Sequence, residues 1–117
     1  MSDIILYHNP RCSKSRAAVE FLAERQIKPE VLLYLEQPLT EPQLAELLSK
    51  LGMSARELMR KGEAIYQELN LANPELSEQQ LIQAMAEHPK LIERPILVVG
   101  ERAAIGRPTE NLLEVLP

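Results

Sequence analysis

A second cysteine is absent from this chain of 117 residues, so Cys12 cannot take part in an internal disulfide. No apolar run approaches the roughly 20 residues that cross a bilayer, and the first residues show neither a basic leader nor an apolar stretch of signal-peptide length. We therefore expect a cytoplasmic, reducing location. A lone cysteine there is either a small buried hydrophobe or a reactive thiol that needs a partner from outside the chain.

An excess of positive charge is also lacking, because the formal net charge is −4 at pH 7. Duplex binding usually requires a basic surface, so we expect no nucleic-acid partner, and without a long apolar run we expect no membrane partner. His8 and His88 are too far apart in sequence to form zinc-type ligand spacing with a single cysteine. We expect no metal and no bound cofactor.

The first third of the chain predicts a βαβ unit. Apolar runs indicate strands at 3–7 and 30–35, and a helical pattern over 12–26 joins them. The apolar residues that share one face of this helix are Ala18, Phe21 and Leu22. Strands joined in this way are parallel and have a right-handed crossover.

The middle of the chain is predicted to be helical, because capping boxes mark three helix starts. The paired residues are Thr40 with Gln43, Ser54 with Glu57, and Ser77 with Gln80. The apolar stripes of the first and third helices are Leu44, Leu47, Leu48 and Leu51, and Leu81, Ile82 and Met85. Gly52 ends the first helix, Pro89 follows the third, and residues 70–74 are predicted to form a loop.

The last part of the chain predicts a hairpin and a final helix. Strands at 96–99 and 102–105 flank Gly100 and Glu101, and glycine at the first turn position suits a type II′ turn. Pro108 suits the first position of the final helix. The residues of this helix that we expect to face the core are Leu112, Leu113 and Leu116.

These elements predict an α/β fold. Its sheet is thioredoxin-like, with four mixed strands in the order βαβ then ββα, and a helical insertion at 40–90 separates the two halves. The chain shows no repeats or low-complexity tracts, and its length suffices for one core, so we expect a single domain over 1–117.

Cys12 lies where the first strand gives way to the first helix, in the string His8-Asn9-Pro10-Arg11-Cys12-Ser13-Lys14-Ser15. Such a turn places a thiol beside free backbone N–H groups and the positive end of the helix dipole, which favour a thiolate and a bound anion. This position favours a reactive thiol over inert packing.

His8 and Ser15 are candidates for supporting roles at this turn. Ser15 either donates to the sulfur or caps the helix. His8 either polarises the site through Asn9 or the thiol, or is a hydrogen-bonded surface residue. We expect Lys14 and Arg16 to be solvated.

Four motifs, in order and spacing, resemble the glutaredoxin-dependent arsenate reductase family from residue 3 to about 116. They are His8-Asn9-Pro10 with Cys12 and Ser15, Leu58-Met59-Arg60-Lys61, Glu93-Arg94-Pro95-Ile96, and Gly106-Arg107-Pro108. The resemblance implies a nucleophilic Cys12, with Arg60, Arg94 and Arg107 around the oxyanion. It also implies glutathione as co-substrate, glutaredoxin as partner, and a role in arsenic resistance.

The three arginines suit this chemistry. Arsenate is a tetrahedral oxyanion that guanidinium forks and backbone N–H groups hold well, and several positive groups must offset the repulsion between it and a thiolate. Locally, Arg94 precedes Pro95, where thioredoxin-like folds carry a cis-proline beside the nucleophile. Without the resemblance, Arg60 would be a solvated helix end, and Arg107 would occupy the N-cap of the final helix, in contact with a polar or anionic group or bare at the surface.

The expected function is reduction of arsenate to arsenite, and other classes stay open. A monothiol oxidoreductase acting on glutathione-linked disulfides would use the arginines to hold carboxylates. Thiol-stress regulators that bind RNA polymerase share the fold, but they commonly carry Cys-x-x-Cys, whereas this chain has Pro10-Arg11-Cys12-Ser13. A relative that shares only the fold, without catalysis, would be unaffected by alkylation of Cys12.

Overall fold

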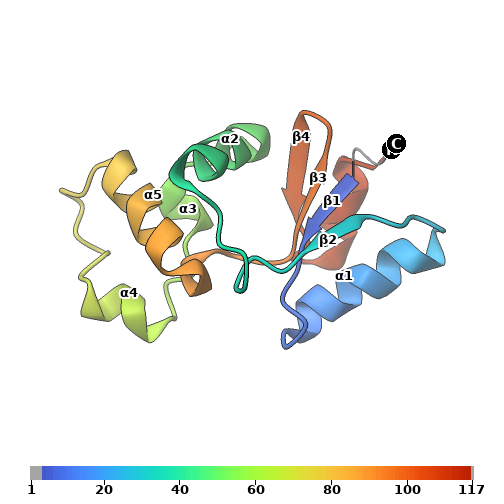
Figure 1. The fold of residues 1–117 in the computed structure, drawn as a ribbon, viewed down its shortest axis with the longest axis horizontal. Helices are drawn as coiled ribbons and strands as arrows, with labels where there is room; N and C mark the ends of the chain where they lie inside the picture. Colours follow the sequence, from blue (N-terminus) through green and yellow to red (C-terminus); the bar gives the residue numbers. More distant parts are fainter. Residues whose placement is uncertain (1–3, 117) are drawn as a thin grey trace. The chain divides into compact units, whose positions relative to one another are not determined.

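The computed structural model describes residues 4–116 (Figure 1). Two compact units make up the chain. The sheet unit comprises the segments up to Gln37 and from Arg94 onward, and the helical unit is Pro38–Glu93. The predicted insertion at 40–90 falls within the helical unit, while a single domain over the whole chain stays a prediction.

The sheet unit contains a four-stranded mixed sheet with the strand order β2-β1-β3-β4. The strands are β1 (Ile4–Tyr7), β2 (Glu30–Leu32), β3 (Ile96–Val99) and β4 (Arg102–Ile105). β1 is parallel to β2 and antiparallel to β3, and β3 and β4 form an antiparallel hairpin. The predicted α/β class and thioredoxin-like sheet are confirmed. Residue 3, the predicted first residue of the first strand, lies outside the described residues.

One face of this sheet packs against α1 (Ser13–Glu24) and the 3-10 helix η2 (Thr109–Glu114). Leu6 pairs with Leu97 and Leu97 with Ala104, so their side chains share that face. The core cluster on this face is Leu6, Ala18, Leu22, Leu97, Ala104, Leu112 and Val115, with Phe21 partly buried against it. The predicted apolar face of the first helix is therefore confirmed.

β2 is shorter than the strand predicted at 30–35. Its partner β1 ends at Tyr7, which pairs with Leu32, and the His8 amide closes the ladder by donating to the Leu32 carbonyl at 2.9 Å. The chain then turns after Leu33, whose carbonyl accepts hydrogen bonds from the backbone amides of residues 36 and 37, at 3.0 and 2.9 Å. The strand was predicted too long because the apolar residues continue to residue 35, whereas β1 offers no backbone partner beyond Tyr7.

η2 also differs from the α-helix predicted at the end of the chain. A 3-10 helix has three residues per turn, so positions three apart share a side. Leu112 is fully buried and Val115 is 6% exposed, whereas Leu113 is 50% exposed. The prediction that Leu113 faces the core is wrong for this reason, while Leu116 does pack against the core cluster.

The helical unit contains four α-helices and a 3-10 turn within the described part of the chain. They are α2 (Glu41–Leu51), α3 (Ala55–Leu58), α4 (Ala64–Glu68), α5 (Glu78–Glu87) and η1 (Pro89–Leu91). All three predicted capping boxes are present, at the starts of α2, α3 and α5. The hydrogen bonds that Ser54 makes with Glu57 lower the pKa of that carboxyl. Gly52 ends α2 with φ of 68°, as its prediction required.

α4 was not predicted, because its start carries no capping signal: Glu63 is its N-cap and makes no side-chain cap hydrogen bond. A short antiparallel contact ties the segment before α4 to the segment after η1. Met59 pairs with Ile92, and the Arg60 amide donates to the Leu91 carbonyl at 2.7 Å. Within residues 4–116, every helix is too short or too polar to cross a bilayer.

Candidate active site

Cys12 is the N-cap of α1 and ends the loop that follows β1. Its amide donates to the Asn9 carbonyl at 3.0 Å, and its own carbonyl accepts the first bond of the helix from the Arg16 amide at 3.0 Å. The amides of residues 13–15 precede that bond and lie at the positive end of the helix dipole. The predicted position of the thiol at a strand-to-helix turn is therefore confirmed, and Cys12 is 9% exposed.

A buried hydrogen-bond network lies behind this loop. Ser15 Oγ accepts from the Asn9 amide at 2.9 Å and lies 2.8 Å from His8 Nδ1. Ser15 is fully buried and His8 is 9% exposed. The surface alternative for His8 is therefore wrong, and since Cys12 is the N-cap, so is the helix-cap alternative for Ser15. Ser15 instead fixes the backbone of the loop, and its donation to the sulfur stays a prediction.

The charge state of His8 follows from this position. Burial is the first cause and the positive charge of Arg16 the second, and both lower the pKa of His8 below its ordinary value of 6.5. The imidazole is therefore kept neutral near pH 7. In the neutral tautomer that carries its proton on Nε2, Nδ1 can accept a hydrogen bond from the Ser15 hydroxyl.

Arg16 does more than the solvated role predicted for it. Its side chain is exposed, like that of Lys14, but Nη1 donates to the Pro10 carbonyl at 2.9 Å. Together with the hydrogen bond from the Arg16 backbone amide to the Cys12 carbonyl, this contact holds the loop against the first turn of α1. The contact with Pro10 could not be predicted from the sequence, because an i,i+6 contact depends on the loop geometry.

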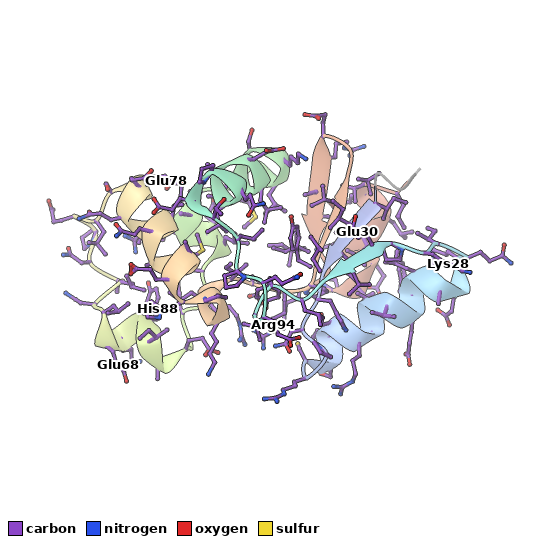
Figure 2. The ribbon with its side chains drawn as sticks, viewed as in Figure 1. Lys28, Glu30, Glu68, Glu78, His88 and Arg94 are labelled. Atoms are coloured by element: carbon purple, nitrogen blue, oxygen red, sulfur yellow. The ribbon has the colours of Figure 1, made fainter. Side chains whose placement is uncertain are left out.

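Arg107 reaches Cys12 across 95 positions of sequence. Its Nη2 lies 3.6 Å from Cys12 Sγ, and its Nε donates to the Arg94 carbonyl at 2.7 Å. Arg94 lies two residues before β3 (Figure 2). The predicted association of Arg107 with Cys12 is thus present, and the backbone of Arg94 holds the Arg107 guanidinium.

Both arginines precede cis-prolines, Arg94-Pro95 and Arg107-Pro108. From the sequence, a cis bond was expected only at Arg94-Pro95, and none was predicted at Arg107-Pro108. Pro108, rather than Arg107, is the N-cap of the final helix, so the N-cap prediction for Arg107 is wrong.

Gly106 joins the two arginine-bearing segments and was not identified as a site residue. Its amide donates to the Pro95 carbonyl at 2.9 Å. A Cβ at this position would lie 2.9 Å from Pro95 Cγ and 3.3 Å from a Leu112 methyl carbon, so only glycine fits without movement. The sequence signal that could have found it is a glycine directly before the Arg107-Pro108 pair.

Arg60 belongs to the helical unit and pairs there with two carboxylates. Nη1 donates to Glu63 Oε2 at 2.8 Å, and Nε lies 3.6 Å from Glu93 Oε1. The Arg60 side chain is 25% exposed, so the solvated helix end that local sequence suggested is wrong. Contact of Arg60 with an oxyanion stays a prediction.

A family model described as the ArsC family matches residues 7–115. This chain belongs to the ArsC family. It is 57% identical over 112 residues to the uncharacterized protein YfgD of Escherichia coli (strain K12), covering 95% of this chain and 94% of that protein. It is 49% identical over 117 residues to an arsenate reductase of Neisseria meningitidis serogroup A, covering 99% of this chain and all of that protein. The solved structure of an arsenate reductase from Vibrio cholerae matches with a TM-score of 0.95 and 47% identity over 97% of each chain.

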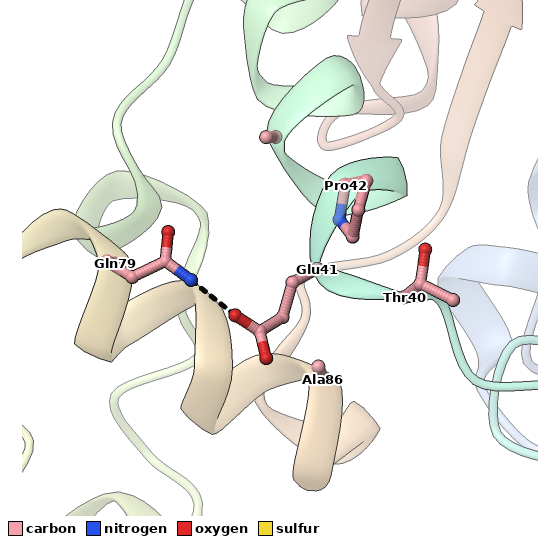
Figure 3. Close-up of a pocket in the computed structure, with 6 residues that line it drawn as sticks. Thr40, Glu41, Pro42, Gln79 and Ala86 are labelled. Atoms are coloured by element: carbon pink, nitrogen blue, oxygen red, sulfur yellow. Dashed lines mark hydrogen bonds between the residues drawn. The ribbon is translucent and has the colours of Figure 1, made fainter.

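Outside the Cys12 loop, this ArsC chain has a surface pocket of about 620 Å³ in its helical unit. Thr40, Glu41, Pro42, Ala45, Gln79 and Ala86 line it, and a hydrogen bond from Gln79 to Glu41 crosses it (Figure 3). No predicted site residue is in its lining. Among residues 4–116, no group of three or more His, Cys, Asp or Glu side chains is arranged to hold a metal ion.

Proposed function

We propose that this ArsC protein reduces arsenate to arsenite, with Cys12 as the nucleophile and glutathione and glutaredoxin as electron donors. The observation that carries the proposal is the 3.6 Å contact between Arg107 Nη2 and Cys12 Sγ at the start of α1. Relatives named arsenate reductase at 41% to 49% identity support the choice of substrate. The cytoplasm is the proposed location, because a lone thiol stays reduced there.

The first step joins sulfur to arsenic. The Cys12 thiolate attacks arsenate, a sulfur–arsenic(V) bond forms, and one arsenate oxygen leaves as water after protonation. Arg107 serves first by lowering the repulsion between the two anions and then by holding the oxygens of the adduct. Arg94 and Arg60 are the other proposed oxyanion ligands, in keeping with the family motifs.

The second step carries the electrons. Glutathione sulfur attacks Cys12 sulfur, a disulfide forms between them, and the electron pair of the sulfur–arsenic bond stays on arsenic, which leaves as arsenite. One thiol pair supplies the two electrons that arsenic(V) gains. Because the chain has one cysteine, glutaredoxin then removes the glutathionyl group from Cys12 by thiol–disulfide exchange.

A coupled assay tests this proposal, with glutathione, glutaredoxin, glutathione reductase and NADPH. We expect arsenate-dependent loss of NADPH with the wild-type protein and none above background with Cys12→Ser, because serine cannot form the disulfide intermediate. Absence of arsenate-dependent turnover in the wild type would refute the proposal. Turnover of a glutathione mixed disulfide in that case would instead select the monothiol oxidoreductase.

A further inference from the structure

Arg60 contacts two carboxylates within the helical unit. Glu63 accepts from Nη1 at 2.8 Å, and Glu93 lies 3.6 Å from Nε. Glu63 and Glu93 are 27% and 28% exposed, so neither carboxylate is fully screened by water. An anion that binds Arg60 therefore has to compete with carboxylates that already contact its guanidinium.

The contacts also use the donor edges that an oxyanion needs. A guanidinium binds a tetrahedral anion bidentately through Nη1 with Nη2, or through Nε with Nη2. Glu63 accepts from Nη1, an atom of the first edge, and Glu93 lies 3.6 Å from Nε, an atom of the second. An anion that binds at either edge therefore competes with a carboxylate for one of its donor atoms.

The two carboxylates differ in strength and in how the backbone holds them. The Glu63 contact has hydrogen-bond length, whereas the Glu93 contact does not. The Glu93 amide donates to the Leu58 carbonyl at 3.1 Å, beside the Met59–Ile92 bridge, so its Cα is fixed next to Arg60. Glu63 lies at the N-cap of α4 without a side-chain cap bond, and its carboxylate is committed to Arg60 instead.

We infer that Glu63 is an internal competitor for Arg60 and sets how tightly the protein binds its oxyanion, with Glu93 in a weaker supporting role. This inference rests on the proposed function, in which Arg60 is an oxyanion ligand. Glu63 acts through Arg60, so it is a positioning residue. Arsenite is uncharged near neutral pH, so the competition acts on arsenate binding and leaves product release unaffected.

The test compares Glu63→Gln, which removes the charge and keeps an oxygen that can accept from Nη1, with Glu63→Asp, which keeps the charge. In the coupled assay we expect Glu63→Gln to lower KM for arsenate about two- to fivefold, the range typical of an exposed ion pair, with kcat within about twofold of wild type. Glu93→Gln should lower KM less. Glu63→Asp should not lower KM.

Two controls separate competition from other effects. Glu68→Gln, on α4, changes the net charge equally at a residue that neither Arg60 contact involves, and its KM should equal that of wild type (Figure 2). In an Arg60→Ala background, Glu63→Gln should no longer lower KM. A lowering of the same size in that background would overturn the inference, because the charge would then act without Arg60.

The failures of the two proposals are distinguishable. If the wild type turns over arsenate and Glu63→Gln has an equal or higher KM, the inference about Glu63 is wrong and the proposed function stands. If the wild type shows no turnover, the proposed function fails, and the inference is judged by sulfate protection of Cys12 from iodoacetamide. The inference would then be overturned if Glu63→Gln needs the same or a higher sulfate concentration than the wild type to halve the rate of Cys12 alkylation.

Discussion

At the scale of single residues, the Cys12 loop is held by side chains that bond to its backbone. Ser15 and Arg16 each bond to loop backbone, at Asn9 and Pro10. These contacts hold the backbone of the loop that carries Cys12. A buried neutral His8 completes the network and makes it sensitive to acid.

The pH dependence of stability follows from His8. Its pKa in the folded protein lies below 6.5, so as pH falls through that value the unfolded chain binds a proton that the folded protein does not. The free energy of unfolding should therefore fall between pH 7.5 and 5.5. His8→Asn, whose amide can still bond to Ser15, should lose less stability over this range, as measured by urea midpoints.

Arg16→Gln provides the matched control for that measurement. It removes the charge that is the second cause of the shift and leaves burial, the first cause, in place. Its loss of stability between pH 7.5 and 5.5 should lie between those of wild type and His8→Asn. An equal loss in wild type and His8→Asn would show that His8 is not the responsible group.

At the scale of elements, local signals located the helix starts. A capping box needs only residues i and i+3, and all three pairs formed as predicted. The hairpin was equally local, and Gly100 has the positive φ, 60°, that the first position of a type II′ turn requires. Sequence therefore predicted the three helix starts and the two strands of the hairpin to the residue.

The cap of α5 offers a direct test at this scale. Ser77 Oγ accepts from the Gln80 amide at 3.1 Å, so Ser77→Ala leaves that donor without its partner. We expect a loss of about 1 kcal/mol in the free energy of unfolding. Ser49→Ala, the same change at an exposed position inside α2, should be neutral or slightly stabilising because alanine favours helix. Equal losses in both variants would contradict the role of the cap.

Other features could not be predicted because they depend on neighbours distant in sequence. β2 stops where β1 stops, and η2 winds as a 3-10 helix that exposes Leu113 and is followed by the buried Val115. Likewise, the pairing of Arg60 with Glu93 joins residues 33 positions apart, since 93 − 60 = 33. No local pattern contains that information.

At the scale of the whole molecule, the site depends on a fold that brings remote segments together. The sequence motifs of the ArsC family were enough to predict Cys12 and the three arginines as site residues, but only the structure shows how Arg107 is held. Gly106 allows close packing against Pro95, and the Arg94 carbonyl accepts from Arg107 Nε. The guanidinium is thereby placed beside the sulfur.

The rate of Cys12 alkylation by iodoacetamide at pH 7, measured with and without sulfate as an unreactive oxyanion, tests whether Arg107 and Cys12 form one anion-binding site. We predict that sulfate slows alkylation of the wild type and that Arg107→Ala both lowers the rate without sulfate and abolishes the protection, because the guanidinium favours the reactive thiolate and binds the anion. Equal rates and equal sulfate protection in the wild type and Arg107→Ala would contradict the claim that Arg107 and Cys12 form one anion-binding site.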